Sequence, residues 1–176
     1  MLKQKLNAGR LMAAGMAALA MGVVSSTDAA TATSNLAVTA SVSANCTIST
    51  APVAFGAYDP VSANATTGLN GTGTVSVTCT NGATTTVTLG QGANAAGGST
   101  AAAPARRLKD GATDFLTYSL FSDTGRTAVW GDTAGTGVAH TGTGTLTALT
   151  VYGVVNAGQQ VPAGNYSDTV VATITF

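Results

Sequence analysis

The amino-acid sequence predicts an all-β sandwich, on the evidence of its hydrophobic periodicity, its composition and its turns. Apolar and polar residues alternate with a period of two in several separate runs, whereas the helical period is nearly absent. Thr, Gly, Ala and Val dominate the composition, and the helix formers Glu, Lys and Leu are scarce. Gly, Pro, Asn and Asp gather between the alternating runs, where turns need them. Short strands separated in this way indicate a sandwich.

The first 29 residues have the features of a secretory signal peptide. A positively charged start is followed by an apolar run from Leu11 to Val24 and then by small residues. We expect cleavage between about residues 29 and 32, after an alanine. The alternative is a membrane anchor, but the run is shorter than the roughly 20 residues that span a bilayer. The protein is therefore expected to pass the inner membrane into the periplasm without inserting into a membrane.

Six segments carry the alternating pattern and are predicted to form strands. The first alternates without a miss over residues 36–48, which is long enough for one long strand or two strands in series. The other predicted strands are residues 74–80, 84–89, 115–121, 146–155 and 168–176. Turn residues predict the loops between them, at residues 59–70, 90–104, 123–144 and 156–165.

Two cysteines, Cys46 and Cys79, follow the predicted signal peptide. An even number of cysteines in an exported chain favours one disulfide. A metal pair or a redox site is the alternative. The cysteines do not have Cys-x-x-Cys spacing and the chain has a single histidine, so this alternative is weak.

The residues before the last predicted strand, Gly-Asn-Tyr-Ser-Asp at 164–168, point to an immunoglobulin-like sandwich. In such sandwiches a tyrosine near the start of strand F hydrogen-bonds back to the backbone at the corner. We therefore expect Tyr166 and Asp168 to be structural corner residues. An ordinary half-buried aromatic role for Tyr166 is the alternative.

Counting predicted strands from residue 44 gives strands A to F, but no strand G. A complete immunoglobulin-type domain places strand G beside strand F. We therefore predict an incomplete immunoglobulin-like β-sandwich over residues 44–176, in which the last strand forms one wall of an open groove. An exposed apolar edge of this kind aggregates unless another strand covers it. The apolar residues expected on this wall are Val170, Ala172, Ile174 and Phe176.

A spare strand lies ahead of this domain, in residues 30–43. Its alternating apolar residues are Leu36, Val38, Ala40 and Val42. A vacancy at one end of the chain and a matching strand at the other predict strand addition between molecules. Such a contact is head-to-tail and does not close on itself, so it generates a fibre. The alternative is pairing within the same chain, which would give an ordinary secreted monomer.

The chain also carries a series of short motifs in a characteristic order from residue 46 almost to its end. They are Cys-Thr-Ile at 46–48, Phe-Gly-Ala-Tyr-Asp-Pro at 55–60, Gly-Thr-Val-Ser-Val-Thr-Cys at 73–79, Arg-Arg-Leu at 106–108, Leu-Thr-Tyr-Ser-Leu-Phe-Ser-Asp at 116–123, Trp-Gly-Asp at 130–132, Val-Tyr-Gly at 151–153 and Gln-Val-Pro-Ala-Gly-Asn-Tyr-Ser-Asp-Thr-Val at 160–170. In these motifs the chain resembles the spore coat protein U domain family, which includes the pilin subunits of archaic (Csu-type) chaperone–usher pili.

The resemblance implies a pilus subunit assembled by donor-strand complementation, with copies of itself or related pilins as neighbours. A periplasmic chaperone would lend the missing strand, and at an outer-membrane usher the next subunit's residues 36–42 would replace it. Cys46 and Cys79 would join strands A and B, and residues 170–176 would form a groove wall. The expected location is the cell surface, with a role in adhesion and biofilm formation. A secreted spore-coat or cell-surface coat protein is the alternative that the family name suggests.

Other function classes fit the sequence less well. Charged residues make up only 8% of the chain, so it offers no basic footprint for nucleic acid. The only histidine, His140, has no acidic residue near it in sequence, and we expect no enzymatic activity, cofactor or metal. A carbohydrate-binding module would need exposed aromatic residues. The only tryptophan, Trp130, lies beside Gly131 and Asp132 in a predicted loop, and we favour a packing role for it.

Overall fold

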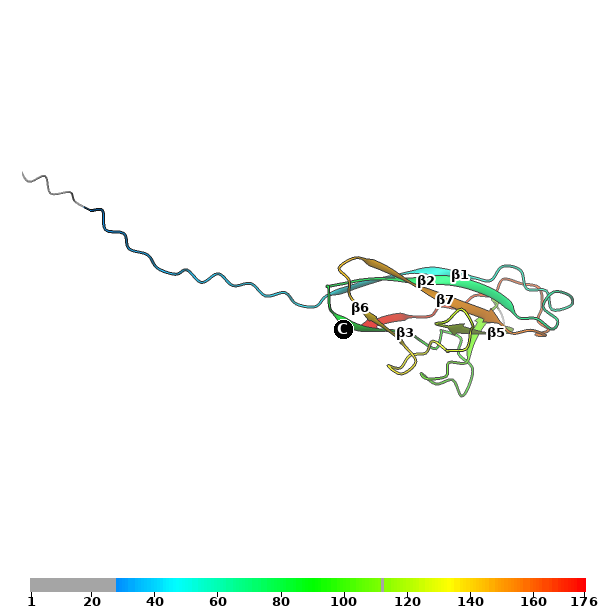
Figure 1. The fold of residues 1–176 in the computed structure, drawn as a ribbon. Coiled ribbons are helices and arrows are strands. Elements are labelled where there is room, and N and C mark those ends of the chain that lie inside the picture. Colours follow the sequence, from blue (N-terminus) through cyan, green and yellow to red (C-terminus); the bar gives the residue numbers. More distant parts are fainter. Residues whose placement is uncertain (1–27, 112) are drawn as a thin grey trace, which may run out of the picture. The chain divides into compact units, whose positions relative to one another are not determined.

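The computed structural model describes residues 28–111 and 113–176, which form eight strands and no helix (Figure 1). The prediction of a signal peptide therefore lies almost entirely outside the described residues. Contacts divide the chain into two units, one ending at Ala40 and the other spanning Ser41–Phe176. Among the described residues, there is no helix with the length and apolar character required to cross a membrane.

Residues 28–40 of the first unit contain no strand and are exposed to solvent. The exposed fraction is 87% for Leu36 and 86% for Val38, and Val42, in the second unit, is also 86% exposed. The first strand begins only at Cys46. The prediction of a strand over residues 36–48 is therefore wrong up to residue 45. Alternation makes a segment suited to a sheet, but a strand forms only where a neighbour accepts its backbone hydrogen bonds.

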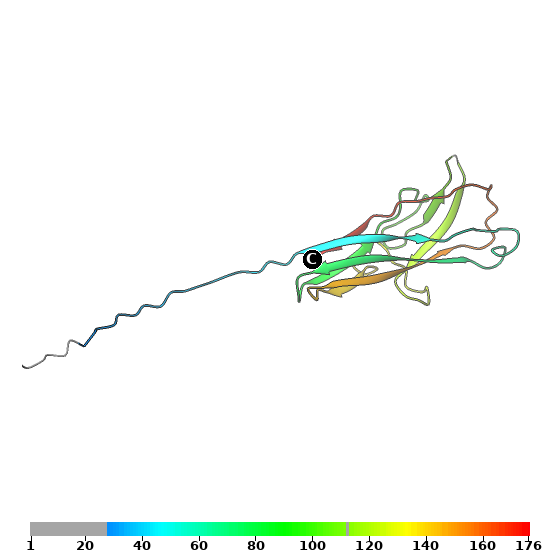
Figure 2. The same ribbon diagram turned by 90° about the horizontal axis from the view of Figure 1, so that it is seen from above.

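The second unit contains two antiparallel sheets, which Figures 1 and 2 show as the layers of a sandwich. The five-stranded sheet has the order β1 (Cys46–Ala54), β2 (Leu69–Cys79), β7 (Leu146–Val155), β5 (Phe115–Phe121) and β4 (Arg106–Lys109). The three-stranded sheet has the order β6 (Val138–Thr141), β3 (Thr84–Leu89) and β8 (Ala172–Thr175). The predicted all-β sandwich class is confirmed.

Most of the strands lie where alternation predicted them. The bounds of β3, β5 and β7 coincide with the predicted segments, β2 begins earlier, and β8 is shorter. The strands β4 and β6 were not predicted, and β6 lies inside the predicted loop 123–144. Both have only four residues, which is too short a run for alternation to be recognised.

The core consists of the inward-facing residues of both sheets and of Trp130. The side chain of Trp130 is 0% exposed, and its Nε1 donates a hydrogen bond of 2.8 Å to the carbonyl oxygen of Val87 in β3. This tryptophan therefore packs between the layers and is not an exposed sugar platform. Residues buried around it are Val75, Val77, Val87, Leu89, Leu116, Tyr118, Leu120, Val151 and Val155.

A disulfide closes the beginning of β1 onto the end of β2. Cys46 and Cys79 are directly paired across the two strands, and their sulfurs are bonded. Beyond the disulfide, the backbone N–H of Asn45 donates to Thr80 Oγ1 at 3.0 Å, and the N–H of Thr80 donates to the carbonyl oxygen of Asn45 at 2.9 Å. The body of the domain is thus fastened immediately after the exposed N-terminal segment.

Reduction of this disulfide should lower the free energy of unfolding. The cysteines are 33 residues apart, and opening a loop of this size costs about 2–4 kcal/mol, because the unfolded chain regains conformational freedom. Denaturant unfolding of the oxidised chain and of the Cys46→Ala/Cys79→Ala variant would measure the difference. Equal midpoints and slopes would contradict the prediction.

Candidate functional site

Two edge strands from different sheets, β1 and β8, define the candidate site. Strand β1 pairs with β2 and strand β8 pairs with β3, and no strand of the described residues pairs with the other edge of either. The two strands contact each other (Figure 2). Each therefore presents a row of backbone N–H and C=O groups without a sheet partner, which is a template for an added strand.

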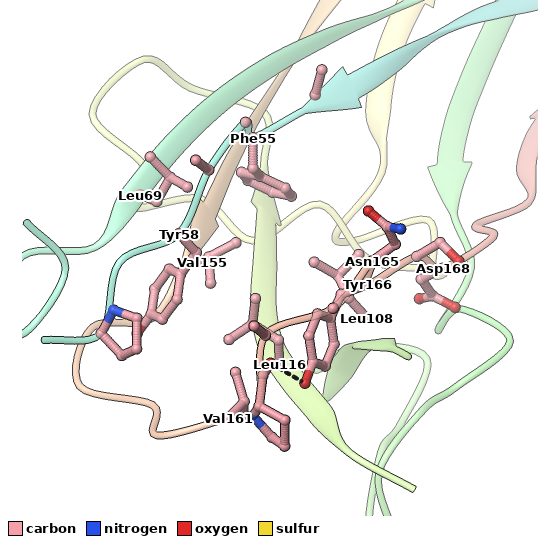
Figure 3. A pocket seen from close by; sticks show the side chains of 18 of the residues that line it. Phe55, Tyr58, Leu69, Leu108, Leu116, Val155, Val161, Asn165, Tyr166 and Asp168 are labelled. Carbon is pink, nitrogen blue, oxygen red and sulfur yellow. Dashed lines mark hydrogen bonds between the residues drawn. The ribbon is translucent and has the colours of Figure 1, made fainter. Parts of the chain in front are cut away.

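An open groove begins beside these edges, continues past the end of β1, and consists of two neighbouring cavities. The smaller, about 280 Å³, is lined by β1 residues 50–53 and by residues 168–170 and 172 near the C-terminus. The larger, about 760 Å³, lies between residues 53–58 and 161–168 (Figure 3). Four residues line both cavities and mark the boundary between them: Val53, Phe55, Leu108 and Asp168.

Of the four residues predicted for the groove wall, only two line the groove in the structure. Val170 and Ala172 line the smaller cavity. Ile174 is half-buried and packs against the core, but it lines neither cavity, and Phe176 is 55% exposed. The wall of the groove therefore begins earlier in the chain than predicted and includes residues 161–168.

Hydrogen bonds hold the side chains of Tyr166 and Asp168, the two predicted corner residues, in place. Tyr166 Oη donates to the carbonyl oxygen of Pro162, four residues upstream, at 2.9 Å (Figure 3). Asp168 Oδ2 accepts a 2.7 Å bond from the hydroxyl of Tyr118. Its Oδ1 accepts bonds from the backbone N–H and the side-chain amide of Asn94, at 3.1 and 3.0 Å. Asp168 therefore ties the C-terminal segment to β5 and to the loop after β3.

Phe55 is aimed into the groove by an irregularity at the end of β1. The register with β2 shifts between Ala51 and Ala54, just before this residue. The ring lies against two glycines that face each other across the sheet, Gly71 in β2 and Gly153 in β7. A Cβ atom at Gly153 would lie 2.7 Å from Phe55 Cζ, and one at Gly71 would lie 2.9 Å from Cδ1. Only glycine admits so close an approach.

A buried arginine holds the wall of the groove to the rest of the sandwich. Arg106 in β4 is 1% exposed, and its guanidinium donates to the carbonyl oxygens of Leu89, Gly90 and Trp130 at 2.7, 2.8 and 2.9 Å. The N–H of Gly90 donates in turn to the carbonyl oxygen of Val171 at 2.8 Å. The cation thereby connects the five-stranded sheet to the segment that enters β8.

Burial shifts the pKa of two groups beneath the groove, Arg106 and Tyr118. It lowers the pKa of the Arg106 guanidinium, and the nearby Tyr118, Asp168 and Asp132 act in the opposite direction. Burial is also the main reason why the pKa of Tyr118 lies far above its ordinary value of 10, and the hydrogen bond to Asp168 adds to the shift. Within the described ranges, no cluster of three or more His, Cys, Asp or Glu residues could hold a metal ion.

Sequence reasoning missed Phe55, Arg106 and Asn94 as parts of the site. A signal for Phe55 was present, because Gly71 and Gly153 interrupt otherwise good strands, and a glycine there indicates close approach of another group. The signal for Arg106 was its place in the Arg-Arg-Leu motif at 106–108, which does not indicate burial, since an arginine is ordinarily solvated.

Comparisons with known proteins identify the family. The family described as Spore Coat Protein U domain matches residues 32–173 of this chain. Over 172 residues the chain is 48% identical to Protein U of Myxococcus xanthus, covering 94% of this chain and 96% of that relative. The chain belongs to the spore coat protein U domain family. The resemblance inferred from the sequence motifs is thereby confirmed.

The fold of this spore coat protein U domain also occurs in a solved structure. It is similar to a chain of the crystal structure of the CsuC–CsuE chaperone–tip adhesion subunit pre-assembly complex, from archaic chaperone–usher Csu pili of Acinetobacter baumannii. The TM-score is 0.53 at 20% sequence identity, and the match covers 77% of this chain. The matched region amounts to 40% of the length of that chain. At this identity the likeness shows a shared fold.

The raised pKa of Tyr118 predicts a loss of stability in alkaline solution. The folded state holds the phenolic proton more tightly than the unfolded state does. The stabilisation is therefore complete below pH 10 and is lost as the pH rises from about 10 toward the folded-state pKa. Denaturant unfolding of the monomeric chain between pH 8 and pH 11 should show this decline, and Tyr118→Phe should show a shallower one. Identical slopes for both proteins would contradict the assignment.

Proposed function

We propose that this protein is a non-enzymatic structural subunit of a bacterial surface fibre, assembled by adding a strand from one copy to the groove of the next. One observation carries the proposal. The same chain presents an exposed segment of alternating apolar residues and an open groove between two unpartnered strand edges. An added strand would supply hydrogen-bonding partners for the backbone of both edges and apolar side chains for the groove.

The donor strand in this proposal is residues 30–43, followed by the body from residue 44 and preceded by a signal peptide over residues 1–29. Its inward-facing residues are Leu36, Val38, Ala40 and Val42, of which Leu36 and the two valines are exposed in the free chain. Burial of such side chains contributes about 1.5–3 kcal/mol each. The hydrogen bonds between Asn45 and Thr80 and the adjoining disulfide support the boundary, because they fasten the chain directly after the donor strand.

An incomplete sandwich that lacks strand G requires protection before it polymerises. An exposed apolar groove with free strand edges aggregates unless it is covered. We infer that a periplasmic chaperone covers the groove after export and that an outer-membrane usher exchanges it for the donor strand of the next subunit. The solved complex of similar fold supports this inference, since it is described as a chaperone–tip adhesion subunit pre-assembly complex. The resulting fibre at the cell surface would support adhesion and biofilm formation.

A coat protein is the second candidate function. The family is described as a spore coat domain, and the chain is 48% identical to Protein U of Myxococcus xanthus. Polymerisation by strand addition would serve a coat layer as well as a pilus. Immunogold electron microscopy separates the two, because a pilus extends away from the cell and a coat subunit labels a continuous layer.

A charge in the donor strand should prevent assembly. Val38→Asp would bury a carboxylate in the groove of the neighbouring copy, at a cost large enough to reduce polymer formation by about a hundredfold or more. Export to the periplasm should be unchanged. The matched control is Ala37→Asp, which places the same charge on the opposite side of the strand, and it should assemble. Normal fibres from Val38→Asp would remove residues 30–43 from the mechanism.

The mature protein produced without its chaperone should be unstable or should polymerise. The free edges of β1 and β8 would then pair with the donor segments of other copies. Size-exclusion chromatography with light scattering would measure the outcome over time at several concentrations. A stable, monodisperse monomer would speak against the proposed function.

A further inference from the structure

Phe55 stands where the two cavities of the groove meet. It lines both of them, together with Val53, Leu108 and Asp168. The ring is only partly buried, so it is accessible from the groove. A strand lying along the groove must pass this ring on its way from one cavity to the other.

The ring has little freedom to move aside. Behind it lie Gly71 and Gly153, close enough that even a Cβ atom on either would overlap the ring. The ring also meets the edge of the Tyr118 ring, with 5.9 Å between centroids and an angle of 63° between planes. Tyr118 is itself fixed, since it is 5% exposed and its hydroxyl donates to Asp168. The boundary between the two cavities is therefore a rigid surface.

We propose that Phe55 determines the register of the entering strand, by accepting only a small side chain above its ring. The inference rests on the proposed function and names the occupant, residues 36–42 of a second copy with Ala40 over Phe55. Phe55 is thus a specificity-determining residue of the groove. It selects the register of the entering strand, whereas β8 supplies apolar contact.

Within residues 36–42, the donor sequence fits this arrangement in one register. Side chains on one face of a strand recur about every 6.8 Å, so neighbours of the residue at Phe55 fall into the cavities on either side. Between Leu36 and Val42, Ala40 is the single small inward-facing residue. With Ala40 over the ring, Val38 and Val42 enter the two cavities. A shift of two residues in either direction would place a valine against Phe55, and overpacking of a rigid contact is unfavourable.

The proposal is tested by enlarging Ala40 and then making room for it. Ala40→Leu in the full-length chain should lower the yield of polymer by about tenfold or more, because the larger side chain meets the ring. The matched control Ala37→Leu makes the same change on the outward face and should assemble to within about twofold of the unchanged chain. Adding Phe55→Ala to Ala40→Leu should restore assembly. Polymer is measured on gels of unheated samples and by electron microscopy.

A second set of variants keeps the test decisive if Phe55→Ala does not fold. Phe55→Leu, the milder change, is combined with Ala40→Leu, and near-ultraviolet circular dichroism reports folding of each monomer. If neither Phe55 variant folds, the variants of the donor strand decide the question. The proposal is sustained if Ala40→Leu loses assembly while Val38→Leu and Val42→Leu still assemble. Equal assembly of Ala40→Leu and Ala37→Leu overturns it. So does a folded Phe55 variant that fails to restore Ala40→Leu.

These outcomes are distinguishable from failure of the proposed function. If Val38→Asp assembles normally, then strand addition through residues 30–43 is itself wrong. If Val38→Asp blocks assembly while Ala40→Leu does not, strand addition stands and only the role of Phe55 falls.

Discussion

The structure depends on the requirement that backbone polar groups in a sheet find partners. In this sandwich the facing edges of β1 and β8 lack a strand between them among the described residues. A cavity opens beside those edges, and a second, larger one continues from it past the end of β1. The same chain carries a segment of alternating apolar residues, Leu36 to Val42, that is exposed to solvent.

An open groove is useful only if its walls keep their shape while it is empty. Two polar groups achieve this here. Arg106 donates to the carbonyl oxygens of Leu89, Gly90 and Trp130. Asp168 accepts hydrogen bonds from the hydroxyl of Tyr118 and from the backbone N–H and side-chain amide of Asn94. Groups of this kind are costly to bury unless they are hydrogen-bonded, so each enforces a specific arrangement of the segments around it. The disulfide and the bonds between Asn45 and Thr80 do the same for β1.

Membership of the spore coat protein U domain family and the fold shared with a chaperone–subunit complex give these features a common interpretation. Under the proposed function, a subunit that is incomplete alone would become complete in a polymer, and the free energy of that completion would drive assembly outside the cell without a nucleotide. A low content of charge suits such a protein, since neighbouring copies then approach with little electrostatic repulsion.

The local sequence pattern by itself determined several strands, the exposed apolar segment and the disulfide of this protein. Period-two alternation placed β3, β5 and β7 correctly and singled out Leu36 to Val42, and the two cysteines indicated one disulfide. Alternation is a property of neighbouring residues, so it can be read directly. Tertiary structure alone decided that residues 36–45 form no strand in the free chain, that Trp130 is buried, and that the hydrogen bonds of Arg106 and Asp168 hold the groove walls in place. It also placed Phe55 on Gly71 and Gly153, because such contacts join residues far apart in the chain, and distance in sequence conceals them.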